Sequence, residues 1–268
     1  MPGLETARYG GNTPCVSLEN GPGVLVLDAG TGIRRLGEAL TARGHGGPID
    51  ILLSHAHIDH IQGLPFFAPV HDPGARVRIH GPAPDTLSLH QTLGRLMVPP
   101  FWPAYYAAVA ERLDVTEITA GEFQTDYFRI RAMPLSHPGR TLGYSITSVA
   151  GGPTVNYMTD NELGTWTGMP SWQVDLVGFL RNTEVLIHDA TYGEDEIPHR
   201  TGWGHSGASQ AVDLAVAAGV RKLILFHHAP EHTDSEIDRL LAEARRRVRG
   251  AGVELDVEAA AEGTAFDL

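Results

Sequence analysis

The sequence is poor in cysteine, in long apolar runs and in positive charge, and each shortage excludes a class of protein. Cys15 is the one cysteine among 268 residues, which excludes an internal disulfide and a cysteine-based zinc site. No stretch approaches the ~18 uninterrupted apolar residues of a membrane-spanning helix. The opening segment MPGLE lacks the basic and apolar regions of a cleaved secretory signal. We therefore expect a cytoplasmic protein with no membrane segment.

The charge balance bears on the partners of the chain. Lysine and arginine number 20 and aspartate and glutamate 32, so the formal net charge is −12. Proteins that hold long nucleic acids by their phosphates usually present a basic face. The arginine run 245–247 lies at the end of a predicted helix, where basic side chains complement the helix dipole. Extended DNA or RNA is disfavoured as a partner, and the sequence leaves the oligomeric state open, a homodimer included.

Aliphatic and β-branched runs bounded by glycine recur along the chain and predict an α/β protein. Helices are predicted over residues 32–42, from Ser206 as N-cap to Gly219, and over 235–248. No repeat or linker divides the chain, so one domain over residues 1–268 is expected. The predicted strands are 24–28, 49–54, 76–80, 127–133, 143–148, 154–159, 184–188 and 221–226.

Residues 82–113 interrupt this pattern with five prolines and a group of aromatic side chains, Phe101, Trp102, Tyr105 and Tyr106. Two interpretations stay open. The segment is either an irregular insertion with a small core of its own or a lid whose aromatic rings hold a planar part of a substrate.

Histidine is over-represented, with 14 residues, and its densest group follows a predicted buried strand as HAHIDH. Because strand side chains alternate, His55 and His57 point the same way, and the next turn carries Asp59 and His60 towards a second point. Imidazole and carboxylate suit Zn²⁺, Mn²⁺ or Fe²⁺ better than Ca²⁺ or Mg²⁺. The motif predicts two neighbouring metal sites.

Three further residues, His137, Asp160 and His227, stand where predicted strands end. Taken singly, each would be an ordinary turn or cap residue. Taken with the first motif, they supply what a two-metal site still needs, namely a third histidine on each metal and a carboxylate between the metals.

These motifs resemble those of the metallo-β-lactamase-fold hydrolases. Asp28, in the segment LDAGTG, resembles the acidic residue that this family places behind its metal ligands. The segments 186–191 (LIHDAT) and 204–206 (GHS) closely resemble motifs of the tRNA 3′-processing endonuclease RNase Z and its phosphodiesterase relatives. In that branch an acidic residue pairs with a histidine that contacts the scissile phosphate, and the matching residues here are Asp189 and His205.

The resemblance implies a four-layer αβ/βα sandwich, with two mixed sheets face to face and helices outside. It also implies two divalent metal ions, Zn²⁺ in the first place and Mn²⁺ or Fe²⁺ otherwise. The implied ligands are His55, His57 and His137 on the first ion, Asp59, His60 and His227 on the second, and Asp160 bridging both.

Three departures from the RNase Z pattern bear on the substrate. Relatives carry a strand before the segment 8–11 (RYGG), they have Glu where Asp189 stands, and RNase Z has a basic, Gly/Pro-rich arm for tRNA that this sequence lacks. The missing arm and the acidity favour a small phosphodiester, such as a cyclic nucleotide, over tRNA.

The expected reaction is attack on such a diester by a hydroxide held between the metals, with Asp59, His205 and Asp189 as the catalytic residues. His205, positioned by Asp189, protonates the leaving alkoxide. The alternatives are a lactone, carboxyl-ester or thioester hydrolase, an RNase Z-like RNA 3′-end nuclease, and a metal-free binding protein. Among the other histidines, His188 is expected to be structural, whereas His228 and His232 either contact substrate or face solvent.

Overall fold

The computed structural model describes residues 3–103, 105–111, 113–164 and 171–268. The chain divides into two compact units: the first is formed by residues Asn12–Met133, and the second by the residues up to Gly11 together with Pro134–Leu268. That both belong to one domain stays a prediction.

The first unit contains a five-stranded mixed sheet in the order β1-β2-β3-β4-β5. The first pair is antiparallel, with Leu18 opposite Leu25, and each later strand is parallel to its neighbour. The strands β2 and β3 are buried along their whole length, as their uninterrupted aliphatic runs predict. The bounds are β1 (Val16–Asn20), β2 (Gly23–Leu27), β3 (Ile49–Leu52), β4 (Val77–Gly81) and β5 (Asp114–Glu117), with an antiparallel hairpin of β6 (Gly121–Gln124) and β7 (Phe128–Pro134).

Helices close the core of this unit. Helix α1 (Ile33–Ala42) buries Ile33 and Leu40 in the cluster that contains the sheet residues Val26 and Ile51. The other helices are short: α2 (Ile58–Ile61), α3 (Ala68–His71), α4 (Leu89–Leu96), α5 (Tyr105–Ala110) and the 3₁₀ turn Leu64–Phe66.

The segment 82–113 packs on the same core. Leu89 and Leu93 of α4 are buried in the cluster that holds the sheet residues, so the described part of the segment shares the core of the unit. The Trp102 ring lies 4.5 Å from that of Tyr106 and 5.0 Å from that of Phe66. Trp102 and Tyr106 therefore pack against one another, whereas Phe101 and Tyr105 are exposed.

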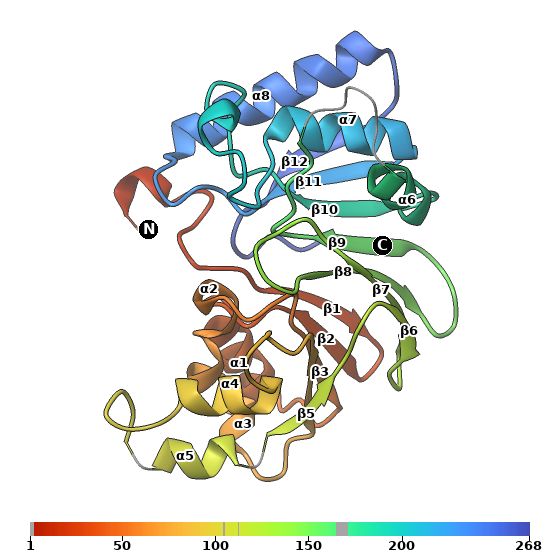
Figure 1. Cartoon of the computed structure of the whole chain (residues 1–268). Coiled ribbons are helices and arrows are strands. Elements are labelled where there is room, and N and C mark those ends of the chain that lie inside the picture. Colours follow the sequence, from red (N-terminus) through yellow and green to blue (C-terminus); the bar gives the residue numbers. More distant parts are fainter. Residues whose placement is uncertain (1–2, 104, 112, 165–170) are drawn as a thin grey trace. The chain divides into compact units, whose positions relative to one another are not determined.

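The second unit carries the strands β8 (Leu142–Ser148), β9 (Thr154–Met158), β10 (Val185–Asp189), β11 (Lys222–Phe226) and β12 (Asp256–Ala259) in the order β12-β11-β10-β9-β8. The pair β8–β9 is antiparallel and the others are parallel. Figure 1 shows α7 (Ala208–Ala218) and α8 (Asp234–Ala251) side by side along one face of these strands, and α6 (Ser171–Phe179) contacts α7. Because β9, β10 and β11 are parallel, the residues that follow them meet at one sheet edge.

Each of the eight predicted strands is present, with its ends shifted by at most two residues. The predicted N-cap at Ser206 is wrong, because Gly207 occupies that position. The Ser206 hydroxyl instead accepts a hydrogen bond from the Leu163 amide and donates one to the Asn161 carbonyl. That side chain ties the loop after β9 to the start of α7.

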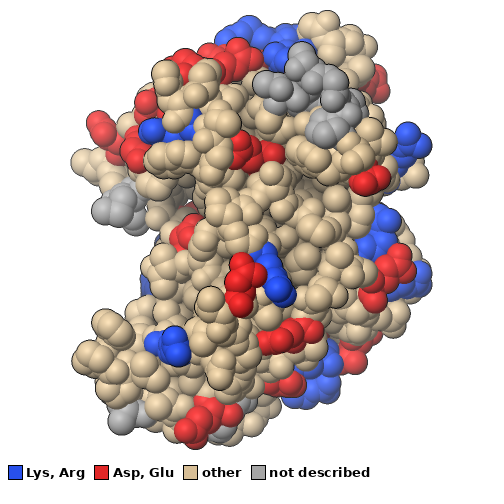
Figure 2. All heavy atoms as spheres, in the orientation of Figure 1, with Lys and Arg blue, Asp and Glu red and all other residues tan. Residues whose placement is uncertain are grey.

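The surface shows how the charges are distributed. On the face seen in Figure 2, lysine and arginine lie interspersed with aspartate and glutamate. In the run 245–247, Arg247 pairs with Asp213 at 2.6 Å and with Glu194 at 3.3 Å. The Nε of Arg245 donates to the Val257 carbonyl. The arginine run therefore stabilises its own unit. Among the described residues, no helix is both long and apolar enough to cross a membrane.

Candidate metal centre

The first group of predicted ligands lies just after β3 and on α2. The ring of His55, which is 3% exposed, lies 4.4 Å from the ring of His57 and 4.3 Å from that of His60. Nε2 of His60 lies 3.3 Å from Oδ2 of Asp59. The structure thus brings together the four polar residues of the HAHIDH motif, all within the first unit.

Asp28 orients two of these rings from behind. Its Oδ2 lies 2.8 Å from Nδ1 of His60 and accepts the Ser54 hydroxyl, whose oxygen lies 3.0 Å from Nδ1 of His55. The carboxylate of Asp28 can only accept a hydrogen bond, and the Ser54 hydroxyl already donates its hydrogen to Asp28. Nδ1 of His60 and Nδ1 of His55 must therefore each carry a proton. The Nε2 lone pair of each ring is then available for a metal, as in carboxylate–histidine–metal triads. Asp28 thus contacts the side of His60 that faces away from Nε2, as expected for a residue behind the predicted ligands.

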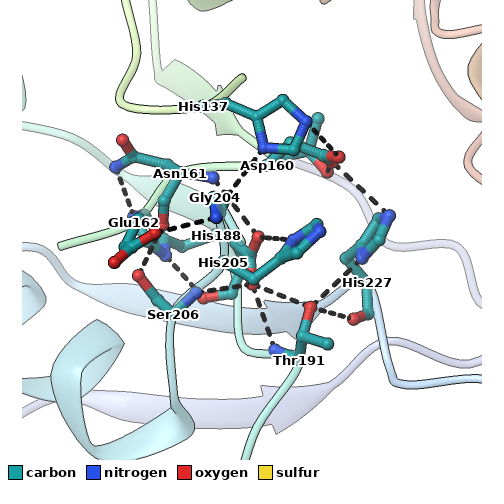
Figure 3. A network of polar contacts seen from close by, with 12 residues as sticks. His137, Asp160, Asn161, Glu162, His188, Thr191, Gly204, His205, Ser206 and His227 are labelled. Carbon is teal, nitrogen blue, oxygen red and sulfur yellow. Dashed lines mark hydrogen bonds and ion pairs between the residues drawn. The ribbon is translucent and has the colours of Figure 1, made fainter. Parts of the chain in front are cut away.

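The second group lies in the second unit, at the edge where parallel strands end. Asp160 follows β9 and is 2% exposed, and His227 follows β11. Oδ2 of Asp160 lies 3.6 Å from Nε2 of His137, and Oδ1 lies 3.4 Å from Nε2 of His227. Each carboxylate oxygen therefore faces a different imidazole (Figure 3).

The protonation of these rings tests whether they fit a metal. Nδ1 of His137 lies 2.9 Å from the Gly204 carbonyl, which can only accept. Nδ1 of His227 lies 3.1 Å from the Thr191 hydroxyl, whose own hydrogen goes to the His227 carbonyl at 2.7 Å or to Asp189 at 2.9 Å. The Nε2 lone pair of each ring then faces a carboxylate oxygen of Asp160. These two electron-rich atoms repel each other unless a cation lies between them. The donor set fits divalent metal ions on the carboxylate of Asp160.

Asp189 and His205 form a pair beside this group. Nδ1 of His205 lies 2.7 Å from Oδ2 of Asp189, and the ring stacks on His227 with centroids 4.9 Å apart. The buried Asp189 carboxylate also accepts the amides of Thr191 at 3.1 Å and Ser206 at 3.2 Å. Asp160, Asp189, His205 and His227 each place a possible ligand atom within 4.8 Å of the others.

A family described as "Beta-lactamase superfamily domain" matches residues 24–228. The chain belongs to the metallo-β-lactamase superfamily. It is similar to Ribonuclease Z of Exiguobacterium sibiricum, with 28% identity over 237 residues that cover 73% of this chain and 75% of the relative.

Two solved structures show that the chain has the metallo-β-lactamase fold. Unliganded yeast PDE1 matches with a TM-score of 0.74 and 16% identity over 98% of this chain and 95% of its own. The short form of human tRNase Z matches with a TM-score of 0.64 and 18% identity over the same shares, 98% and 95%. The predicted αβ/βα sandwich with two mixed sheets is confirmed.

Three site residues of this metallo-β-lactamase-fold chain have left-handed backbone conformations. The φ angle is 61° at Asp28, 52° at Asp160 and 60° at His227. Such angles are uncommon for residues other than glycine, and they concentrate at functional sites. At each of the three residues the backbone turns sharply, just after a strand has ended.

Sequence reasoning missed the residues that support the ligands from a distance. Both carboxylate oxygens of Glu162 accept backbone amides, one from Gly202 and one from Gly204, each at 2.8 Å. Gly204 has φ +86°, and a Cβ there would lie 2.1 Å from Nδ1 of His137. Glu162 therefore holds the backbone that orients a predicted ligand, yet it belongs to no motif.

Three further histidines have structural contacts. His188 is fully buried, burial lowers its pKa, and Nδ1 lies 2.7 Å from the Asp189 carbonyl, as its expected structural role requires. His228 donates to the Ala260 carbonyl at 3.1 Å, and burial lowers its pKa to about 4. His232 is 6% exposed and contacts Glu196 at 3.1 Å. His228 and His232 therefore bond to the protein itself, which differs from both expectations for them.

Proposed function

We propose that this chain is a dinuclear metal-dependent phosphodiesterase that acts on small phosphodiesters such as cyclic nucleotides. The superfamily and the His/Asp groups support a metal-dependent hydrolase. The observation that carries the finer proposal is the contact of His205 with Asp189 beside Asp160. A lactone or thioester hydrolase needs the metal ligands but has no use for that pair.

The ligand assignment made from the sequence is part of this proposal. Both groups of side chains leave Nε2 lone pairs of histidine available for a metal ion, and their carboxylates balance the charge of divalent cations. We assign His55, His57 and His137 to one ion, Asp59, His60 and His227 to the other, and Asp160 to both. Zn²⁺ is the ion we expect first, with Mn²⁺ and Fe²⁺ as alternatives.

The bound ions supply Lewis acidity, which activates water and neutralises charge on the phosphoryl oxygens. The chain's own residues do the rest. Asp189 fixes the ring of His205 through Nδ1, so that Nε2 is left to face the substrate. As the bond from phosphorus to the leaving oxygen breaks, the imidazolium form of His205 donates its Nε2 proton to that oxygen and becomes neutral imidazole, with Nδ1–H still bonded to Asp189. Asp28 and the Gly204 carbonyl keep the ligand rings in one orientation.

The size of the substrate separates this proposal from its nearest alternative. Several relatives are named ribonuclease Z or ribonuclease BN, which favours an RNA 3′-end nuclease. The net charge of −12 and the ion pairs of Arg247 favour a small diester instead. The proposal includes a cytoplasmic location. There the thiol of Cys15, which is partly buried and has its pKa raised by that burial, stays reduced.

The test compares His205→Ala with wild type on diesters that have alkyl leaving groups. We expect kcat to fall about 10²–10⁴-fold, the loss expected for a missing general acid, while the metal content stays unchanged. The defect should shrink with a p-nitrophenol leaving group, which departs without a proton. His199→Ala, in the 3₁₀ turn Ile197–His199 of the same unit, is the matched control.

Equal activity of wild type and His205→Ala on an alkyl diester would refute the proposed role. An unimpaired variant that hydrolyses lactones would move the assignment to the ester and lactone hydrolases. Cleavage of a pre-tRNA 3′ trailer at a far higher kcat/KM than any small diester would favour the nuclease.

A further inference from the structure

The loop before His205 is held rigidly, although it lies at the surface. Gly202 and Gly204 both adopt left-handed angles, φ +83° and +86°, and both donate their amides to Glu162. The amide of Trp203 donates to the Arg200 carbonyl at 3.1 Å. Trp203 therefore stands between two anchored glycines, two residues before His205.

The side chain of Trp203 is nevertheless 56% exposed. The Arg200 guanidinium lies 4.8 Å from the centroid of its ring and 6.0 Å from that of Tyr192. The Tyr192 ring in turn lies 6.0 Å, edge-on, from the ring of His205. The exposed indole of Trp203, the guanidinium of Arg200, the buried phenol of Tyr192 and the imidazole of His205 thus form one continuous group.

Arg200 adds a positive charge that the protein itself leaves uncompensated. Among the described residues, no carboxylate forms an ion pair with its guanidinium. In a chain of net charge −12, such a cation near Tyr192, whose ring contacts that of His205, favours a ligand that carries phosphate. Arginine also stacks readily on aromatic faces, so it steadies the indole while keeping its N–H donors free.

We propose that Trp203 is a stacking platform for the nucleobase of a nucleotide substrate, with Arg200 covering one face of the indole. The proposal rests on the proposed function and narrows it to diesters of nucleosides. A large apolar ring held in water by a clamped loop gains nothing for the fold, whereas a rigid aromatic side chain binds a base at little entropic cost. Every base has a π face, so the platform selects for a base without choosing among bases.

The experiment measures binding apart from catalysis. Isothermal titration of the metal-loaded protein with adenosine 5′-monophosphate and with ribose 5-phosphate compares two ligands that differ only in the base. We expect wild type to prefer the nucleotide by about 5- to 150-fold in Kd, the range for one stacked base. Trp203→Ala should bring the ratio of the two Kd values close to one, and Trp203→Phe should keep part of the preference.

Trp172→Ala is the matched control, because Trp172 lies on α6 of the same unit and is 37% exposed. It should leave the ratio unchanged. A wild-type ratio near one would overturn the platform, as would a preference that survives in Trp203→Ala. If Trp203→Ala fails to fold in a thermal melt, the ratio in Trp203→Phe decides. Hydrolysis of a cyclic nucleotide by wild type tests the phosphodiesterase separately from the ratio of the two Kd values, so either proposal can fail alone.

Discussion

Substitution of Glu162 tests whether the loop that it holds through Gly202 and Gly204 keeps the site residues in position. In Glu162→Gln one side-chain oxygen can still accept an amide, but the other becomes an NH₂ group that faces the second amide. One of the bonds from Gly202 and Gly204, each 2.8 Å long, is therefore lost. Hydrogen bonds to a charged group contribute about 1.5–3 kcal/mol each, so we expect unfolding to become easier by about 2 kcal/mol.

At this chain length a loss of 2 kcal/mol lowers Tm by about 4–8 °C. The loss should also reach the site, because the Gly204 carbonyl orients His137 and the same loop carries His205. We expect metal affinity, measured by competition with a chelator, to fall about 10-fold. The value of kcat/KM should fall about 10- to 100-fold, because small displacements of catalytic groups are costly.

Glu184→Gln is the control, since Glu184 makes an exposed ion pair with Arg221 in the same unit. Exposed pairs contribute about 0–1 kcal/mol, so all three readouts should stay near wild type. The reasoning would be refuted if Glu162→Gln lowered Tm as expected but left metal affinity and kcat/KM within twofold of wild type. It would equally fail if nothing changed at all.

Three other changes give separate checks. Asp28→Ala removes the acceptor of His60, so chelator resistance should fall about 10- to 100-fold, and wild-type metal retention would contradict this role. In Asp50→Asn the buried contacts to Arg78 are weakened, and urea unfolding should show a loss of about 3 kcal/mol. Burial alone would raise the pKa of Asp50, but hydrogen bonds from His80 and Arg78 outweigh it and lower that pKa. The loss should therefore be full above about pH 4 and shrink as pH falls through the folded-state pKa. Leu93→Ala should cost about 2–5 kcal/mol, and a negligible loss would mean that α4 is no part of the core.

The sequence predicts best where one segment carries its own signal. The runs that became β2, β3, β10 and β11 are aliphatic and bounded by turns, so they were identified without any knowledge of their partners. The short strands β1, β5, β6 and β12 escaped prediction. Their polar, partly exposed residues, such as DVTE in β5, become strands only through pairing with neighbours that are distant in the chain.

The same division holds at the site. The HAHIDH motif and the strand-end residues are visible because histidine and aspartate recur at fixed places. Glu162 meets Gly204 across 42 residues and Thr191 meets His227 across 36, and no local pattern encodes such contacts. For the same reason the sequence predicts an N-cap at Ser206, because its distant partner Asn161 cannot be recognised from the local pattern.

The left-handed backbone at Asp28, Asp160 and His227 also shapes how this protein can be engineered. Each angle costs of order 1–3 kcal/mol in a residue other than glycine, so glycine at any of the three positions would relieve backbone strain. A selection for heat stability alone would therefore favour the loss of any of these side chains whose hydrogen bonds contribute less than the strain costs. At Asp28 the bonds from Ser54 and His60 oppose that loss. Stabilising such a chain while keeping its chemistry requires that these three positions be excluded from the search and that improvements come from sites such as the exposed helix faces.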